Sequence, residues 1–242
     1  MTACTIWQEG APECSVYSLL YLGGRVVRRR DRAVRALRKI LELYSGREPW
    51  WKRENLPPFW VAVAIAVSPR TTSKLEEEAV KRLMRKFPGG AEDLASARIE
   101  DVEEAIRVSG MYKSKARAIK ALAQWELEGP GVASLAELPT EEAREMLKSL
   151  PGIGDKIADV VLMALGHPVL PVDVHVDRLT KRLGLVDQKA DYRQTKEALE
   201  EIFSPDERMR AHFALIEFGR TFCKAKPNCK SCPLRSDCPS AS

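Results

Sequence analysis

The side chain with the clearest potential for chemistry is Lys156, which follows the segment LPGIG (150–154) between two helical patterns. Glycines at 152 and 154 permit positive φ and let another backbone approach closely. The helix that begins after them presents unpaired N–H groups and the positive end of its dipole. A phosphate suits such a turn, so Gly152 and Gly154 are predicted to bind a nucleic-acid backbone without reading bases. A plain corner between two helices explains the glycines equally well.

Lys156 is expected in the first turn of that helix, where the dipole disfavours a cation by roughly 0.3–1 kcal/mol. Burial there would lower its pKa and favour the free amine, which can attack a carbon atom and form a Schiff base. A lysine that makes one phosphate contact is the alternative. Asp173 is predicted to cap the next helix, and its carboxylate is also suited to stabilising an oxocarbenium-like sugar centre.

Four of the six cysteines lie together near the C-terminus, with five, two and five residues between successive members: Cys223, Cys229, Cys232 and Cys238. Four thiolates suit either tetrahedral zinc or a [4Fe–4S] cluster, and the wide outer gaps favour the cluster because its four corners are separate. Disulfides rank behind both, since disulfide frameworks are typical of smaller secreted chains. Lys226 and Lys230 in the same loop either neutralise the cluster or contact phosphate.

The elements that must position these residues are all helical. No stretch alternates with a period of two, and apolar residues recur at helical spacing. This pattern predicts an all-α protein with helices over 28–46, 59–68, 72–87, 99–110, 113–129, 139–150, 155–165, 174–185, 191–203 and 206–223. In the helix over 72–87, Leu75, Ala79, Leu83 and Met84 form the apolar face and the charges form the other. Residues 48–58 are interpreted as a loop.

Composition sets outer bounds on function. The 242 residues are 45% hydrophobic and 30% charged, with a net charge of +5, as in an ordinary globular protein that can bind a polyanion. The start of the chain lacks a signal-peptide pattern. The longest apolar run, 59–68, is too short for a bilayer, which needs ~20 residues. We therefore expect a cytoplasmic or nucleoid-associated monomer with no membrane partner.

Taken together, the hairpin with its lysine, the segment VDVHVDRL (172–179) and the four-cysteine loop resemble the endonuclease III family of helix-hairpin-helix DNA glycosylases. Further matches are GMYKSKARAI (110–119) and FGRTFC (218–223). The resemblance extends from about Pro58 to Pro239. It implies a six-helix barrel domain over 58–168, with the hairpin motif at about 140–165, and a [4Fe–4S] domain formed by 29–57 and 169–242, with the cluster loop at 223–238. Residues 1–28, which contain Cys4 and Cys14, form an extension that the family does not explain.

The resemblance also implies an activity. The family contains bifunctional DNA glycosylases and AP lyases of base excision repair, which flip damaged nucleotides out of duplex DNA. Lys156 matches the lysine that attacks C1′, expels an oxidised pyrimidine and opens the strand by β-elimination, and Asp173 matches the superfamily's shared aspartate. The implied partner is double-stranded DNA with damaged bases or abasic sites, and the implied cofactor is the [4Fe–4S] cluster.

Met111 matches the position of an apolar wedge, although a core methionine is the alternative. Pro69, beside Arg70, stands where the family usually has a glutamine that fills the space left by the flipped nucleotide. The predicted DNA contacts are Gly152, Gly154, Met111, Pro69, Arg70, Lys113, Lys115, His175, Lys226 and Lys230.

Two other functions stay open. A mismatch glycosylase that removes T, U or A is favoured by Pro69 and opposed by Lys156. A non-catalytic, cluster-bearing DNA-binding module would bind duplex DNA in a salt-dependent way without releasing a base.

Overall fold

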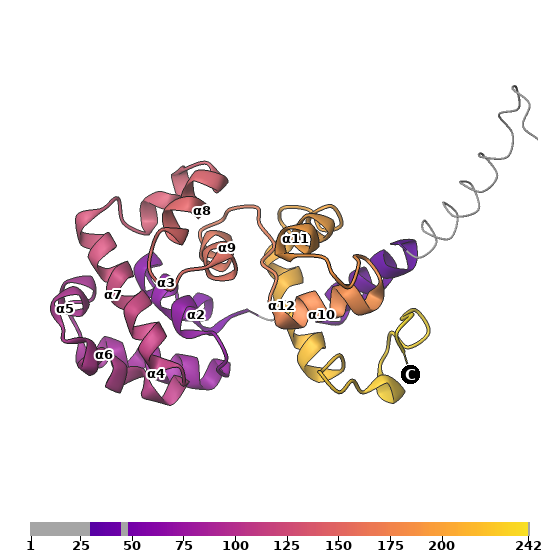
Figure 1. Ribbon diagram of the computed structural model, residues 1–242, viewed down its shortest axis with the longest axis horizontal. Helices are drawn as coiled ribbons and strands as arrows, with labels where there is room; N and C mark the ends of the chain where they lie inside the picture. Colours follow the sequence, from indigo (N-terminus) through magenta and orange to yellow (C-terminus); the bar gives the residue numbers. More distant parts are fainter. Residues whose placement is uncertain (1–29, 45–47, 242) are drawn as a thin grey trace, which may run out of the picture.

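The computed structural model describes residues 30–44 and 48–241. The predicted extension over 1–28, with Cys4 and Cys14, lies outside these residues. Within them every regular element is a helix, which confirms the all-α prediction (Figure 1). After a helix over residues 30–43, the elements are α2 (Trp50–Arg53), α3 (Pro58–Val67), α4 (Ser73–Lys86), α5 (Ala91–Ser96), α6 (Ile99–Ile106), η1 (Arg107–Ser109), α7 (Tyr112–Glu128), η2 (Ala133–Glu137), α8 (Thr140–Lys148), α9 (Asp155–Ala164), α10 (Val174–Leu183), α11 (Tyr192–Glu200), α12 (Arg208–Thr221) and η3 (Cys229–Ser231).

The first lobe is built around α3, which contacts α4, α7 and α9 (Figure 1). Its sequence, PFWVAVAIAV, is apolar on every side because neighbouring helices surround it. Pro58 occupies the first position, where its missing N–H costs no helical hydrogen bond. The next helix, α4, is capped at its N-terminus by Thr72, whose hydroxyl accepts from the Leu75 N–H at 3.3 Å. Local chemistry therefore favours the starts of both helices. The loop between them consists of residues 68–72.

The second lobe joins the two ends of the described chain. The helix over residues 30–43 packs with α10, α11 and α12 around a second hydrophobic core, which includes Leu37, Ile40 and Phe218 (Figure 1). Val169 belongs to the first core and Leu170 to the second. The division into domains at 57/58 and 168/169 stays a proposal, and Trp50 and Trp51, which it assigns to the second domain, pack in the first core.

The segment predicted as a loop over 48–58 contains the short helix α2, which corrects that interpretation. Both of its tryptophans are buried, because Trp51 packs against Phe213 of α12 and the Trp50 indole N–H donates to the Glu76 carboxylate at 2.8 Å. Glu76 is therefore buried, although the pattern of α4 placed all the charges of that helix on the solvent side. A short helix without a capping side chain or a full apolar repeat carries little local signal.

A buried polar network joins the hairpin to the second lobe. Asp159 of α9 is fully buried, and its Oδ1 accepts from Arg144 Nε of α8 at 2.7 Å. Its Oδ2 accepts from the Tyr192 hydroxyl of α11 at 2.7 Å, and Lys196 Nζ lies 3.6 Å away. Because α9 carries Lys156 and α11 belongs to the second core, this carboxylate fixes one lobe against the other.

Replacing Asp159 with alanine is expected to lower the free energy of unfolding by about 3–5 kcal/mol, because Arg144 would keep a buried charge without its buried partner. Urea denaturation measures the change. Asp155→Ala on the same helix is the control, since the Asp155–Lys148 pair at 3.0 Å lies at the surface, where ion pairs contribute little to stability. Equal losses in the two variants would contradict the assigned role of Asp159.

Among the described residues, every helix is too short or too polar to cross a bilayer.

Candidate active site

The turn between α8 and α9 depends on one glycine. Gly152 has a φ of +83°, and a Cβ there would lie 3.1 Å from the Cβ of Ala118 in α7, so a larger residue is both strained and crowded. Gly154 has a φ of −104°, which other residues adopt readily, and a Cβ there would meet nothing within 4 Å. The turn therefore uses the positive φ that glycine permits at Gly152, whereas Gly154 does not adopt it. The exposed N-terminus of α9 has no side-chain cap among the described residues, which leaves its N–H groups available to an anion.

Lys156 lies in the first turn of α9, where the pattern placed it. Its ammonium donates to the Ser68 hydroxyl at the C-terminus of α3, with 3.4 Å between the two atoms. Burial lowers the pKa of Lys156, and the nearby charge of Arg220 lowers it further, whereas Asp173 and Glu76 act in the opposite direction. Burial thus shifts Lys156 towards the free amine, and the charges of two carboxyl groups oppose that shift.

Asp173 caps α10, which confirms the predicted cap. Its Oδ1 accepts from the N–H groups of His175 at 2.8 Å and Val176 at 2.9 Å. Both bonds use the same oxygen, so Oδ2 is outside the cap. The charge of Asp173 acts on Lys156 across the lobes. One carboxylate therefore caps the start of a helix and acts electrostatically on the lysine.

Two histidines beside Asp173 are held in the neutral form. Burial lowers the pKa of His212 to about 4, and its Nδ1–H donates to the Pro171 carbonyl at 2.9 Å. Burial also lowers the pKa of His175, whose Nδ1 lies 3.0 Å from an Arg178 nitrogen. A Cβ on Gly219 would lie 2.8 Å from the Cβ of His175, so α10 and α12 approach this closely only with glycine there. Neither histidine adds a positive charge near Lys156 at neutral pH.

Glu76 is the site residue that the sequence pattern missed. It is 9% exposed, lies in the first turn of α4, and accepts from Trp50. Burial raises the pKa of Glu76 to about 7, against the opposing effects of the Trp50 hydrogen bond and of the charges on Lys156, Arg220 and Lys115. Its carboxyl therefore titrates near neutral pH.

Glu76→Gln is expected to gain stability over the wild type as the pH rises from about 5 to about 8. The pKa of Glu76 rises from 4.5 to about 7 on folding, so in this interval the folded state holds a proton that the unfolded state has lost, and wild-type stability falls with pH. Over the whole interval the wild type is expected to lose about 3 kcal/mol of unfolding free energy relative to Glu76→Gln. Urea denaturation at both pH values tests this against Glu77→Gln, whose carboxylate pairs with Lys81 at 2.7 Å. A constant gap between wild type and Glu76→Gln would contradict the burial of an ionisable group here.

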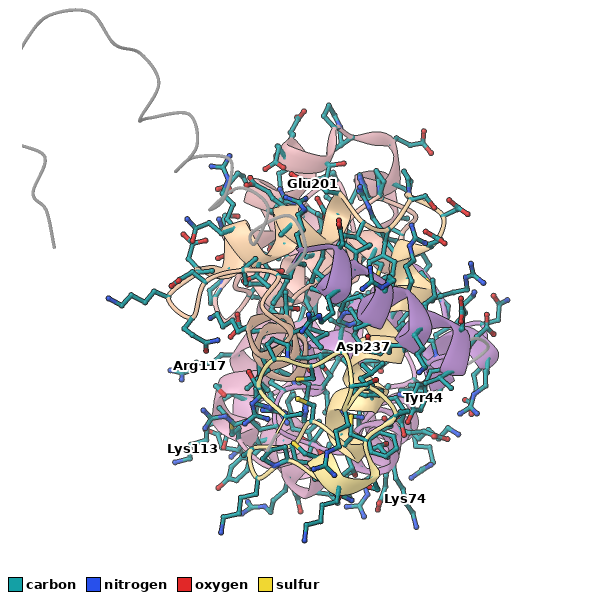
Figure 2. The ribbon with its side chains drawn as sticks, turned by 90° about the vertical axis from the view of Figure 1, so that its right-hand side faces the viewer. Tyr44, Lys74, Lys113, Arg117, Glu201 and Asp237 are labelled. Atoms are coloured by element: carbon teal, nitrogen blue, oxygen red, sulfur yellow. The ribbon has the colours of Figure 1, made fainter. Side chains whose placement is uncertain are left out.

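The predicted DNA contacts separate into exposed and buried residues. Met111 is 50% exposed and has a left-handed φ of +48°, which points to a projecting side chain rather than a core methionine. Arg70 is exposed with a φ of +52°, next to the half-buried Pro69. Figure 2 shows Lys113 projecting on the same side of the molecule as Arg117. Lys226 and Lys230 are exposed on the C-terminal loop.

Lys115 differs from its predicted role. It is 3% exposed, and its ammonium donates to the Ser109 carbonyl at 2.8 Å and to the Ser109 hydroxyl at 3.2 Å. Burial lowers the pKa of Lys115 to about 8. These contacts direct it into the protein, so it has no access to a phosphate. Lys113 and Lys115 are separated by one residue, and the sequence alone did not show which of the two is buried.

The four C-terminal cysteines line one pocket, together with the apolar side chains of Leu179, Phe222 and Leu234. Arg182 of α10 lies against this loop, with Nη1 3.5 Å from the Cys223 sulfur and 2.6 Å from the Lys224 carbonyl, and Arg178 donates to the Cys223 carbonyl at 2.9 Å. Within the described residues, no three His, Cys, Asp or Glu side chains converge as metal ligands would. The donor set still fits a cluster, since all four thiols face one cavity beside cations that offset thiolate charge.

Comparison with known proteins places this arrangement among DNA repair proteins. Residues 63–205 match the HhH-GPD superfamily base excision DNA repair protein family. The chain is similar to endonuclease III of Bacillus subtilis, with 36% identity over 183 residues that cover 75% of this chain and 80% of that one. A solved non-covalent endonuclease III–DNA complex is similar at a TM-score of 0.73 and 31% identity, covering 85% of this chain and 93% of that one. A trapped covalent endonuclease III–DNA intermediate is similar at a TM-score of 0.70 and 31% identity, covering 86% and 96%.

Proposed function

The chain belongs to the endonuclease III family of the HhH-GPD superfamily and is a bifunctional DNA glycosylase and AP lyase of base excision repair, and we propose that Lys156 is its nucleophile and Asp173 its stabilising carboxylate. The observation that carries this assignment is the partly buried Lys156 at the N-terminus of α9, with its pKa lowered by burial and the Asp173 charge facing it. A lysine held in this way is suited to nucleophilic attack and poorly suited to stabilising its own helix.

In the proposed reaction the neutral amine of Lys156 attacks C1′ of the damaged nucleotide. The bond between C1′ and the base breaks, and the base leaves with the bonding electrons and takes up a proton. Asp173 stabilises the positive charge that develops on the sugar. The amine then loses a proton and the sugar ring opens, which gives a Schiff base between Nζ and C1′. Removal of a proton from C2′ expels the 3′ phosphate by β-elimination.

The proposed phosphate-binding site consists of the turn at Gly152 and the uncapped N-terminus of α9, which would hold a DNA phosphate next to Lys156. Its partner is duplex DNA that contains a damaged base or an abasic site, bound by a monomer. Met111 is suited to entering the base stack when the nucleotide flips out, because it is exposed and apolar. Lys113, Arg70, Lys226 and Lys230 supply surface charge for other phosphates, and His175 lies beside Asp173 at the site. The substrate class in this proposal is oxidised pyrimidines.

The proposed cofactor is a [4Fe–4S] cluster held by Cys223, Cys229, Cys232 and Cys238. When bound, it supplies a four-point cross-link of the C-terminal loop. Arg178 and Arg182 attach that loop to α10, the helix that Asp173 caps. The protein is thus expected to use the cluster to hold the second lobe in the shape that presents Asp173.

Cys232→Ser is expected to remove most of the bound iron and the broad visible absorption of the cluster, and to weaken binding to duplex DNA. The reason is that the loop would lose one of four ligands. Metal and sulfide analysis of the purified protein measures the loss, with Ser231→Ala as the neighbouring control. Bound zinc without inorganic sulfide in the wild type would contradict the cluster.

The experiment for the proposed function incubates the protein with duplexes that carry thymine glycol, an abasic site or a mismatch, with and without borohydride. Base release and strand cleavage are scored separately. We expect both on thymine glycol, cleavage at the abasic site, and a covalent adduct with borohydride. Base release confined to mismatches without an adduct would indicate the mismatch glycosylase, and salt-dependent binding without release would indicate a non-catalytic module.

A further inference from the structure

A second carboxyl group, Glu76, is buried in the first turn of α4, the helix that follows the loop from Ser68, and Ser68 is the hydrogen-bond partner of Lys156. Glu76 comes from the first turn of α4, whereas Lys156 comes from the first turn of α9 and Asp173 from the N-cap of α10. Helix α3 contacts both α4 and α9, and Ser68 at its end bonds to Lys156 at 3.4 Å. The Trp50 indole fixes the Glu76 carboxyl by a 2.8 Å hydrogen bond. Three helix N-termini thus carry two carboxyl groups and one amine, and the charges of both carboxyl groups act on the amine.

We infer that Glu76 is a positioning residue for Lys156, a buried counter-charge that holds the lysine in its ammonium form when Glu76 is ionised and releases the amine when Glu76 is protonated. The inference rests on the proposed role of Lys156. It extends the site beyond Lys156 and Asp173, because the state of a third residue then sets the pH at which the nucleophile becomes available.

The groups that face this pair come from every element packed around it. Asp173 of α10 and Glu76 favour the ammonium form of Lys156, and Arg220 of α12 favours the amine. His212 of α12 is neutral and interacts with Lys156. The charges of Lys115 on α7 and of Arg220 favour the ionised form of Glu76. Burial raises the pKa of Glu76 to about 7, which places its titration at neutral pH.

The sign of the effect follows from these charges. Ionised Glu76 raises the pKa of Lys156, so removing the carboxylate lets Lys156 lose its proton at lower pH. Glutamine keeps an oxygen that accepts from Trp50 and removes only the charge. Glu76→Gln therefore isolates the electrostatic role from the packing role.

The test measures single-turnover formation of the borohydride-trapped adduct on abasic-site duplex across neutral and mildly alkaline pH. We expect the rising limb of the rate profile to move to lower pH by about one unit in Glu76→Gln. Glu77→Gln, on the solvent side of the same helix, is expected to keep the wild-type profile. Glu76→Asp keeps a carboxylate and is expected to show a smaller shift than Glu76→Gln. An abasic site is used because it removes base release from the measured step.

A profile that keeps its wild-type midpoint in Glu76→Gln would overturn the inference, whether the rate is unchanged or falls equally at all pH values. Such a result assigns Glu76 a packing role alone. The proposed function fails in a different way, by the absence of an adduct in the wild type. A shifted midpoint in Glu76→Gln, together with adduct formation by the wild type, supports both the role of Glu76 and the proposed function.

Discussion

Lys156→Ala is expected to abolish strand cleavage and the borohydride-trapped adduct, with a loss of about 10³-fold or more in rate, while leaving DNA binding nearly intact. The reason is that Lys156 supplies the amine that forms the Schiff base, whereas the grip on phosphate comes from the turn at Gly152 and the N-terminus of α9. Single-turnover assays on abasic-site duplex and a binding titration measure the two effects separately.

The same variant is expected to be more stable than the wild type by roughly 0.3–1 kcal/mol, because it removes a cation from the positive end of the α9 dipole. Loss of activity with a gain in stability is characteristic of a residue kept for chemistry. Lys113→Ala is the matched control, since that lysine is exposed on α7 and is assigned only a phosphate contact. A cleavage rate in Lys156→Ala equal to that of Lys113→Ala would overturn the assignment.

Asp173→Asn is expected to reduce base release by about 10²–10³-fold with little change in stability. Asparagine caps helices as well as aspartate does, so its side-chain oxygen can still accept from the N–H groups of His175 and Val176. The variant loses the charge that faces Lys156 and the sugar.

Asp173→Ala completes the comparison, because it loses the charge and the cap together. It is expected to show a similar loss of base release and an additional 0.5–2 kcal/mol, roughly, of destabilisation. Urea denaturation and single-turnover release of thymine glycol measure both quantities. If Asp173→Asn releases the base at the wild-type rate while Asp173→Ala does not, the residue is a helix cap and its charge has no part in the chemistry.

The features of this site that the sequence predicted are those set by local rules. The position of Lys156 in the first turn of α9 and the Asp173 cap each depend on a few adjacent residues. The longer helices were predictable for the same reason, since each carries several turns of apolar repeat. The terminal cysteines could be assigned to one site because their spacing is dense.

The features that the sequence did not predict depend on contacts between distant segments. Glu76 belongs to a run of three glutamates, and only the packing of Trp50 from a segment interpreted as a loop shows that the first of them is buried. Lys115 is separated from exposed Lys113 by one residue, and its bond to Ser109 decides which of the two points inward. A charged residue gives no local sign that a neighbouring helix will cover it.

Burial lowers the pKa of two lysines, Lys115 and Lys156, so the central question is which of them is the nucleophile. Lys115 donates to a carbonyl inside the first lobe, while Lys156 donates to Ser68 and feels the charge of Asp173 from the second lobe. The most direct measurement is therefore peptide mass mapping of the borohydride-reduced adduct formed on abasic-site duplex. The account predicts that the reduced sugar is attached to the peptide that contains Lys156, at its Nζ. Attachment to Lys115, to Lys113 or to the chain's N-terminal amine would contradict it.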